Sequence, residues 1–372
     1  MEIRVKDIMN LMDAWAPPAL AESWDHPGLQ AGSPDAPVHT VLTALDLTRA
    51  NLDYAMAHGV DMIVSHHPFL FKGMKTVDLR TEKGRMLADL LSHGITAFAA
   101  HTNLDTAAEG VNDALADVLG LENRTGLVPV HQDAVYKLVV YVPVAHEEAV
   151  RRAVTDAGAG IMGAYTRCTF SSAGTGRFVP GAGAHPYLGS EGREEEADEV
   201  RLETFLPESA ISRVMAAVRK AHPYETPVAD LYPLRGEGRW DSMGRVGELP
   251  RAMSGEEAVR YVKEKLGLAA AKYAGPIHRT VRRAAVLGGA GAEFMGLAAA
   301  AGADLYLTGD VKYHEAQEAA AMGLLIIDGG HFHTEKMIIP RMAARLREAA
   351  EDNGWDLSVV EDPTAEDVFS YL

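Results

Sequence analysis

Residues 61–70, "DMIVSHHPFL", place two adjacent histidines at the end of a short apolar run. The apolar run and the proline that closes the stretch are typical of a buried strand that ends there. In a strand, the side chains of His66 and His67 would point to opposite faces. Packing does not require two imidazoles at this place, and burying both without partners costs desolvation free energy. The stretch therefore predicts a strand of a covered sheet with a metal site at its end.

The segments on either side of this strand alternate between strand and helix patterns. Strand-like runs occupy residues 38–47 and 95–105, and helical spacing occupies 48–59 and 81–94, each helix ending at a glycine. Apolar strands separated by helices indicate a parallel sheet that is covered on both faces. The first part of the chain is therefore predicted to be an α/β lobe.

The last part of the chain repeats this plan, with strand patterns at 282–291, 303–310 and 324–335 and helices at 292–302 and 312–323. The segments "HGVDMIVSHH" and "AGADLYLTGD" fall at the same step of the two plans. We infer a weak internal duplication. The alternative is that helix–glycine–strand units are common to all α/β folds.

The middle of the chain follows a different pattern, predicted as strand 136–143, helix 146–158, strand 165–180, loop 183–198, strand 199–207, helix 208–223 and strand 226–234. The order β-α-β-β-α-β is that of a ferredoxin-like unit. Because it interrupts two matching halves, we interpret it as an inserted α+β domain. The predicted domains are a first α/β lobe at 1–128, the insert at 129–238 and a second α/β lobe at 239–372.

The amino-acid composition disfavours or excludes several classes of partner and site. The 372 residues are 47% hydrophobic and carry a formal net charge of −17, which disfavours nucleic acid as a partner. The single cysteine, Cys168, excludes an internal disulfide and a cysteine-based zinc site. We read no signal peptide and no apolar run of membrane-spanning length, so we expect a cytoplasmic protein without a membrane partner.

Histidines and carboxylates collect at the predicted carboxyl ends of three strands, where parallel α/β sheets bind ligands. They are His66 and His67, His101 and Asp105, and Asp328, His331, His333 and Glu335. Imidazole and carboxylate are ligands for zinc, iron, manganese and cobalt, and the set is large enough for two ions. His333 is left open as a ligand, a second-shell residue or a solvent-facing histidine.

The spacing within these groups is regular. His101 and Asp105 are four residues apart, as are His331 and Glu335. We expect a helix to start near Thr334, and Pro340 would strain a long helix there. Because metal ligation needs neutral imidazoles, affinity should fall as the pH drops through the usual histidine range, near about 6.5.

Five motifs together resemble the NIF-three-like dinuclear metal-centre family, often labelled GTP cyclohydrolase 1 type 2 homologues. They are "ESWDHPGLQAG" (22–32), "SHHPFLFKG" (65–73), "AAHTNLDTAAEGVND" (99–113), "LTGDVKYHEA" (307–316) and "DGGHFHTE" (328–335). The resemblance covers both outer halves of the chain. One departure is "WDHPGL" in place of the usual "WDNVGL"-like stretch, which puts the rim of the site at His26 and Pro27 in question.

The resemblance implies two divalent metal ions per subunit, with ligands at His66, His67, His101, Asp105, His331 and Glu335. It also implies a toroidal homohexamer, for which sizing should give roughly six times the chain mass. The long form of the family carries a middle domain similar to PII/CutA-type proteins, which fits the insert.

A pair of bridged metals favours hydrolysis. The candidate reactions are a cyclohydrolase attack at C8 of a guanine ring and the hydrolysis of a phosphate ester, so the expected partner is a nucleotide or a phosphorylated small molecule. Asp310 and His314 are candidates for second-shell or proton-transfer roles, against a purely structural one. The alternatives to an enzyme are a metal-dependent regulatory or scaffold protein and a metal buffer.

Two further segments allow two interpretations each. The turn "GGAGAE" (288–293) could hold a phosphate through backbone N–H groups, or its glycines could serve tight packing. His222 and Glu225 in "AHPYET" (221–226) could bind a ligand in the insert, or the segment could simply end a helix.

Overall fold

The computed structural model of the chain describes residues 3–370 and shows a mixed α/β fold with several sheets. The chain forms two compact units. Unit 1 combines the residues up to His131 with those from Asp241 onward, and unit 2 is Gln132–Trp240. Unit 2 is thus inserted into unit 1 in the sequence.

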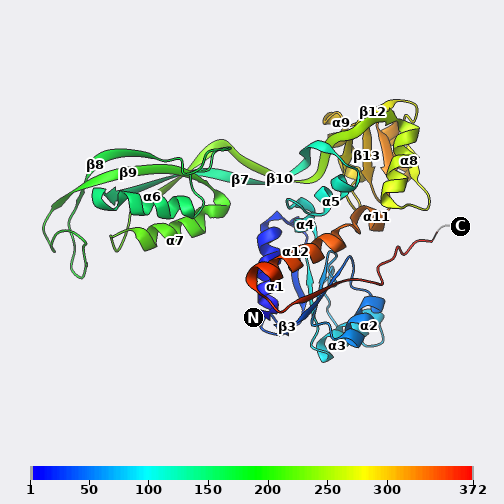
Figure 1. Cartoon of the computed structure of the whole chain (residues 1–372), viewed down its shortest axis with the longest axis horizontal. Coiled ribbons are helices and arrows are strands. Elements are labelled where there is room, and N and C mark those ends of the chain that lie inside the picture. The colour runs from blue at the N-terminus through cyan, green and yellow to red at the C-terminus, as the bar shows by residue number, and fades with distance from the viewer. Residues whose placement is uncertain (1–2, 371–372) are drawn as a thin grey trace. The chain divides into compact units, whose positions relative to one another are not determined.

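The first lobe of unit 1 contains β1 (Ile3–Arg4), α1 (Val5–Trp15), β2 (Gly28–Ala31), β3 (Pro37–Val38), β4 (Thr40–Ala44), α2 (Arg49–His58), β5 (Met62–Ser65), α3 (Glu82–Ser92), β6 (Thr96–Ala99), α4 (Thr102–Thr106) and α5 (Val111–Val118). Its main sheet has the order β15-β4-β5-β6-β2, and only β2 runs antiparallel to its neighbour. Helices α2 and α3 pack on one face, and α1 packs on the other (Figure 1). Strands β5 and β6 are fully buried, as their continuous apolar runs predict.

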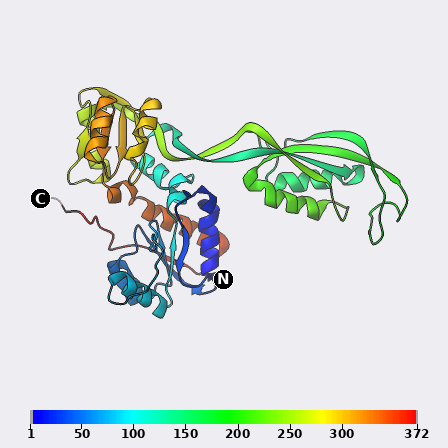
Figure 2. The ribbon, with the colours of Figure 1, turned by 180° about the vertical axis from the view of Figure 1, so that it is seen from behind.

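The second lobe of unit 1 contains α8 (Gly255–Leu266), β11 (Lys272–Ala274), β12 (Thr280–Val286), α9 (Met295–Ala300), β13 (Leu305–Thr308), α10 (Tyr313–Ala321), β14 (Leu325–Asp328) and α11 (His331–Glu335). Its strands follow the order β11-β14-β13-β12, next to the unit 1 part of β10 (Ala229–Ser254). Helices α5 and α8 pack on one face of this sheet, and α9 and α10 pack on the other (Figure 2).

The C-terminal elements α12 (Ile338–Asn353) and β15 (Ser358–Glu361) belong to the first lobe. Strand β15 pairs in parallel with β4, where Val359 lies opposite Val41. The apolar face of α12 packs against α1 in the same core, through Ile338 and Met342 among others. The structure therefore differs from the predicted second lobe of 239–372, because the open edge of β4 and the apolar face of α1 take up the end of the chain.

Unit 2 has the element order β7 (Glu122–Pro143), α6 (Glu147–Asp156), β8 (Phe170–Phe178), β9 (Glu195–Pro207), α7 (Ile211–Ala221) and β10, with the strand order β10-β7-β9-β8. This is the β-α-β-β-α-β order of a ferredoxin-like unit. Both helices pack on the same face of the sheet. Strands β7 and β10 each run through both units.

The two lobes of unit 1 share one local arrangement at the end of a strand. Strand β6 leads into the one-turn helix α4, and β14 leads into the one-turn helix α11. Helix α11 begins at His331 rather than near Thr334, so a full turn brings His331 and Glu335 to one side. Pro340 lies in the first turn of α12, where its missing N–H needs no partner, so it does not strain the helix.

No helix within residues 3–370 is both long enough and apolar enough to cross a membrane.

Candidate metal centre

The carboxyl ends of β5, β6 and β14 meet at one place in unit 1, between the two lobes. There, Nε2 of His67 lies 3.0 Å from Oε2 of Glu335, although the two residues are far apart in the sequence. Nε2 of His331 lies 3.3 Å from the same oxygen. The six residues His66, His67, His101, Asp105, His331 and Glu335 form what we call the histidine–carboxylate cluster.

The four imidazole rings of this cluster lie close together, and the His67 ring is near each of the other three. The His67 ring centroid lies 4.9 Å from that of His66, 5.6 Å from that of His101 and 5.2 Å from that of His331. On the carboxylate side, Nε2 of His66 lies 3.6 Å from Oδ1 of Asp105 and 3.9 Å from Oε1 of Glu335. His66, His67 and Glu335 each offer one ligand atom within 4.8 Å of the others.

Each of the four histidines has its Nδ1 held by an oxygen atom. The pairs are His66 with the Ala100 carbonyl at 2.8 Å, His67 with Asp46 at 2.8 Å, His101 with Asp25 at 3.0 Å and His331 with Asp310 at 2.8 Å. Since these oxygens accept, Nδ1 donates in each pair and Nε2 is left for a ligand. A carboxylate or carbonyl behind each imidazole is the usual second shell of a histidine-ligated metal.

Asp25 shows how firmly one of these partners is held. It is buried, and its Oδ2 accepts hydrogen bonds from the backbone N–H and the hydroxyl of Thr102, at 3.1 and 2.6 Å. Burial alone would raise the pKa of Asp25, but the hydrogen bonds from His101 and Thr102 hold it well below its usual range. The carboxylate therefore stays charged and fixes the His101 ring.

Three buried polar atoms at the centre have no hydrogen-bond partner of good geometry within residues 3–370. They are Nε2 of His66, Oδ1 of Asp105 and Oε2 of Glu335. Buried polar groups are nearly always satisfied, and each exception calls for an explanation. Imidazole nitrogens and carboxylate oxygens are donors that divalent metal ions bind, so bound ions would satisfy these atoms.

Burial and close contacts separate the pKa values of the histidines. Burial of the His66 ring lowers its pKa to about 3, so His66 is neutral. For His67, burial acts in the same direction, but the contacts with Asp46 and Glu335 outweigh it and raise the pKa to about 10. The contact with Glu335 also raises the pKa of His331 to about 9. Without metal, His67 and His331 therefore carry protons at neutral pH.

The pKa values of the two carboxylates in the cluster shift in opposite directions. Burial would raise the pKa of Glu335, but the contacts with His331 and His67 hold it well below its usual range. Burial and the charge of Glu335 raise the pKa of Asp105 well above its usual value. A divalent ion would replace the protons that balance this charge.

Three residues that the sequence singles out make the following contacts outside the cluster. His314 contacts Gln317 and Tyr313 in its own helix. His333 faces the Leu266 carbonyl, Lys336 and Asp367. Asp328 accepts hydrogen bonds from the backbone N–H groups of Val311 and Gly330 and pairs with Lys272. Asp310, by contrast, holds His331 directly.

Sequence reasoning missed Asp46, which orients His67. The signal was present, because Asp46 follows β4 and so lies at the same edge of the sheet as the other strand-end residues. The departure at His26 leaves the site intact, since its backbone N–H donates to Oδ1 of Asp25 at 2.8 Å and its side chain is exposed.

The glycine turn at 288–293 serves packing. The N–H groups of Gly288, Gly289 and Gly291 donate to the side chains of Asn112, Thr334 and Thr308, at 2.9 to 3.0 Å. These three donors are therefore occupied and cannot also hold a phosphate, and the phosphate interpretation of the turn has no support from the structure.

Gly289→Ala is expected to lower the free energy of unfolding by about 2–4 kcal/mol. Gly289 has φ +64°, and an added Cβ would lie 2.3 Å from Oε1 of Glu335. Gly59→Ala is the matched control, because Gly59 has φ +66° and its Cβ would meet nothing within 4 Å, so only the backbone cost of about 1–2 kcal/mol applies. Urea denaturation measures both, and equal losses would contradict the steric argument.

Two exposed aromatic side chains lie beside the cluster. Trp24 and Phe71 are 55% and 50% exposed, and their ring centroids lie 6.0 and 6.1 Å from that of His101. Their position makes them part of the rim of the site.

Comparison with other proteins finds similarity over nearly the whole chain. The family model Duf34/NIF3 (NGG1p interacting factor 3) matches residues 3–367, a range that includes all six cluster residues. Proteins named GTP cyclohydrolase 1 type 2 homolog from Halalkalibacterium halodurans and Bacillus subtilis are 39% identical over 365 residues and 38% identical over 367 residues. Each alignment covers at least 98% of both chains. The crystal structure of a Bacillus cereus protein related to NIF3 superimposes with a TM-score of 0.94 at 38% identity, covering 100% of this chain and 99% of that one.

Proposed function

Because the chain belongs to the Duf34/NIF3 family, we propose that its histidine–carboxylate cluster binds two divalent metal ions and hydrolyses a small substrate there. The observation that carries the proposal is the set of three buried, unsatisfied ligand atoms on His66, Asp105 and Glu335. The donors fit zinc, iron, manganese or cobalt.

The protein's own contribution is to hold the ligands in place before metal arrives. Four anchored Nδ1 atoms leave four Nε2 atoms available, so little side-chain entropy is lost on binding. Glu335 lies within 4 Å of the Nε2 atoms of three histidines, which suits a carboxylate that is shared between two ions. When bound, a pair of such ions supplies activated water and polarises a carbonyl, imine or phosphoryl oxygen. In this scheme Asp310 is a positioning residue for His331.

A cavity of about 560 Å³ beside the cluster is large enough for a nucleotide-sized substrate. Its lining carries the cations Arg49 and Lys83 and the carboxylates Asp46 and Glu82. Because Arg49 is paired with Asp53 and Asp89, Lys83 is the cation that would meet a negatively charged substrate. This supports a phosphorylated substrate, either through a cyclohydrolase attack on a ring or through phosphate-ester hydrolysis.

Turnover by metal-loaded protein tests the proposal against a non-enzymatic regulatory or scaffold role. The protein is purified, its metals are measured, and it is incubated with GTP and a panel of phosphate esters. Turnover that disappears in His67→Gln and persists in His333→Gln supports the enzyme, since His333 lies in α11 with the cluster residues His331 and Glu335 but its Nδ1 contacts the Leu266 carbonyl. Two bound metals with no turnover on any substrate would favour the non-enzymatic role.

Asp25→Asn is expected to weaken metal binding by about 10–100-fold, the usual effect of removing a carboxylate behind a ligating histidine. Asparagine keeps the shape but loses the charge that fixes the His101 ring. Competition with a chelator measures the affinity. Asp328→Asn is the control, because Asp328 is likewise a poorly exposed carboxylate of unit 1 but pairs with Lys272. Equal effects of the two substitutions would argue against a role for Asp25 in the site.

A further inference from the structure

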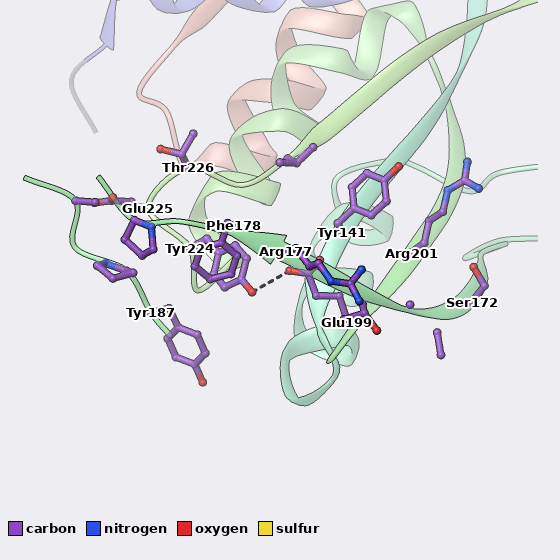
Figure 3. Close-up of a pocket in the computed structure, with 18 residues that line it drawn as sticks. Tyr141, Ser172, Arg177, Phe178, Tyr187, Glu199, Arg201, Tyr224, Glu225 and Thr226 are labelled. Carbon is purple, nitrogen blue, oxygen red and sulfur yellow. Dashed lines mark hydrogen bonds between the residues drawn. The ribbon is translucent and has the colours of Figure 1, made fainter. Parts of the chain in front are cut away.

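One face of the unit 2 sheet carries a cavity of about 580 Å³ whose lining residues all lie between Tyr141 and Val228 (Figure 3). Helices α6 and α7 cover the other face, which buries Val140 and Leu202. Because side chains alternate along a strand, Tyr141 and Arg201, which pair across β7 and β9, point to the face with the cavity. None of the residues of the histidine–carboxylate cluster takes part.

The floor of this cavity is bare because two glycines lie in β8. A Cβ on Gly174 would meet nothing within 4 Å, so the cavity reaches the backbone there. A Cβ on Gly176 would lie 2.3 Å from Oε2 of Glu199, so glycine at this position lets the Glu199 side chain lie across the strand. A flat group can therefore approach the sheet and Glu199 together.

Aromatic side chains form the walls. The ring centroid of Tyr224 lies 6.0 Å from that of Phe178 and 6.2 Å from that of Tyr187. Buried His222 fixes Tyr224: its Nε2 donates to the Tyr141 carbonyl at 2.9 Å, and its Nδ1 accepts the Tyr224 N–H at 3.1 Å. The segment "AHPYET" thus ends helix α7 and also builds one wall of the cavity.

The uncompensated charge in the cavity is negative. Glu199 is only 9% exposed; its Oε1 accepts a hydrogen bond from the Tyr224 hydroxyl at 2.8 Å. Its Oε2 has no hydrogen bond or ion pair within residues 3–370. The two arginines of the lining already have acidic partners, Arg177 with Glu196 at 2.7 Å and Arg201 with Glu203 at 3.1 Å. This oxygen is not among the fully buried unsatisfied atoms, so it is open to the cavity and can accept hydrogen bonds from a ligand.

We propose that this cavity binds a flat ligand whose edge presents two adjacent N–H donors to Glu199. A planar pair of donors matches the two oxygens of a carboxylate, as in arginine–carboxylate pairs. The tyrosine and phenylalanine walls favour a planar group between them. Two kinds of molecule carry such an edge, a guanine-type ring and an alkylguanidinium. The volume lies within the range of small-ligand sites.

Isothermal titration calorimetry of the full-length protein with guanosine, agmatine and adenosine tests the proposal. We expect guanosine or agmatine to bind, and adenosine to bind at least about tenfold more weakly than guanosine, because its amino group lies next to a ring acceptor that would face Glu199. Binding of guanosine identifies a ring ligand, and binding of agmatine alone identifies a guanidinium ligand.

Glu199→Gln is expected to weaken binding by at least about tenfold, because its amide N–H would oppose a ligand donor. Glu203→Gln is the matched control, since Glu203 lies four residues further along β9 on the same face and pairs with Lys137 and Arg201. Gly174→Val, which fills the floor where a Cβ has room, should also block binding while the circular dichroism spectrum is retained. Binding of neither guanosine nor agmatine, or unchanged binding in Glu199→Gln, would overturn the proposal.

Discussion

Glu335→Gln protein is expected to keep its fold and to lose its bound metal, with affinity reduced by more than about 100-fold. Glu335 is 3% exposed and lies where the Nε2 atoms of His67 and His331 converge, at 3.0 and 3.3 Å. Glutamine fills the same volume, but it replaces one ligand oxygen with an NH₂ group that cannot bind a cation. The effect should exceed the roughly 10–100-fold loss that follows removal of an outer-shell partner, because Glu335 is proposed as a direct ligand.

Metal content after dialysis, measured by elemental analysis, checks this expectation. Glu348→Gln is the control for the chemical change, because Glu348 is an exposed carboxylate of the neighbouring helix α12. The wild type and this control should retain about two ions per chain, in the manner of a two-metal site. A Glu335→Gln protein that retains both ions would show that Glu335 is not a ligand, and the proposed site would then have to be built from the histidines and Asp105 alone.

The sequence predicts those site residues whose positions follow directly from the order of the strands in a sheet. Residues that follow parallel strands of one sheet meet at one edge, which predicts that His66, His67 and His101 lie together. Glu335 follows β14 of the other sheet, so its place beside them depends on how the two lobes pack. The start of helix α11 was predicted three residues late, because His331 is a weak helix former and the residues around it carry no N-cap signal. The prediction of strain at Pro340 is wrong because a new helix begins at Ile338, which places Pro340 in its first turn.

Of the partners behind the histidines, the sequence singles out Asp310 and indicates Asp46 by its place after β4, but gives no sign of Asp25. Asp25 holds His101 from 76 positions away, and Asp46 holds His67 from 21 positions away. These two pairs depend on the positions that the loops of the first lobe take up once it has folded. The pairing of β15 with β4 has the same origin, because a four-residue strand gains its place from the free sheet edge and from the core beneath α12.

The cavity of unit 2 could also not be predicted from the sequence. Its walls come from segments that the sequence predicts as turns and loops, including the predicted loop 183–198. The structure starts β9 at Glu195, so part of that segment joins the sheet and brings Glu199 under the aromatic side chains. The motif at 221–226 pointed to this place, but only the hydrogen bonds of His222 explain why its residues occur together.

Metal affinity is expected to rise by about 100-fold per pH unit around neutrality, a stronger dependence than histidines with an ordinary pKa near 6.5 would give. In the metal-free protein the pKa of His67 is about 10 and that of His331 about 9, so both rings are protonated at pH 7. Binding requires neutral Nε2 atoms and therefore releases two protons. His66, with a pKa of about 3, is already neutral and releases none.

The direction of these two pKa shifts also determines the pH range in which the metal-free protein loses stability. A raised pKa in the folded state stabilises the metal-free protein fully below the unfolded value near 6.5, and this contribution is lost as the pH rises through about 9 for His331 and about 10 for His67. Metal-free protein should therefore lose stability between about pH 7 and pH 10, whereas metal-bound protein should not, because the ions replace those protons. The difference in melting temperature between the two forms should widen over this range.

Proton release can be counted directly by calorimetric titration of the metal in buffers of different ionisation enthalpy. We expect about two protons per site at pH 7 and about one in Asp46→Asn, since removal of the Asp46 charge lowers the pKa of His67 toward its usual value. The remaining proton then comes from His331, which keeps its contacts with Asp310 and Glu335. An affinity that does not change between pH 7 and pH 8.5, or an unchanged proton count in Asp46→Asn, would mean that the metal binds without displacing the protons of His67. In that case the ring at the centre of the cluster would not be a ligand.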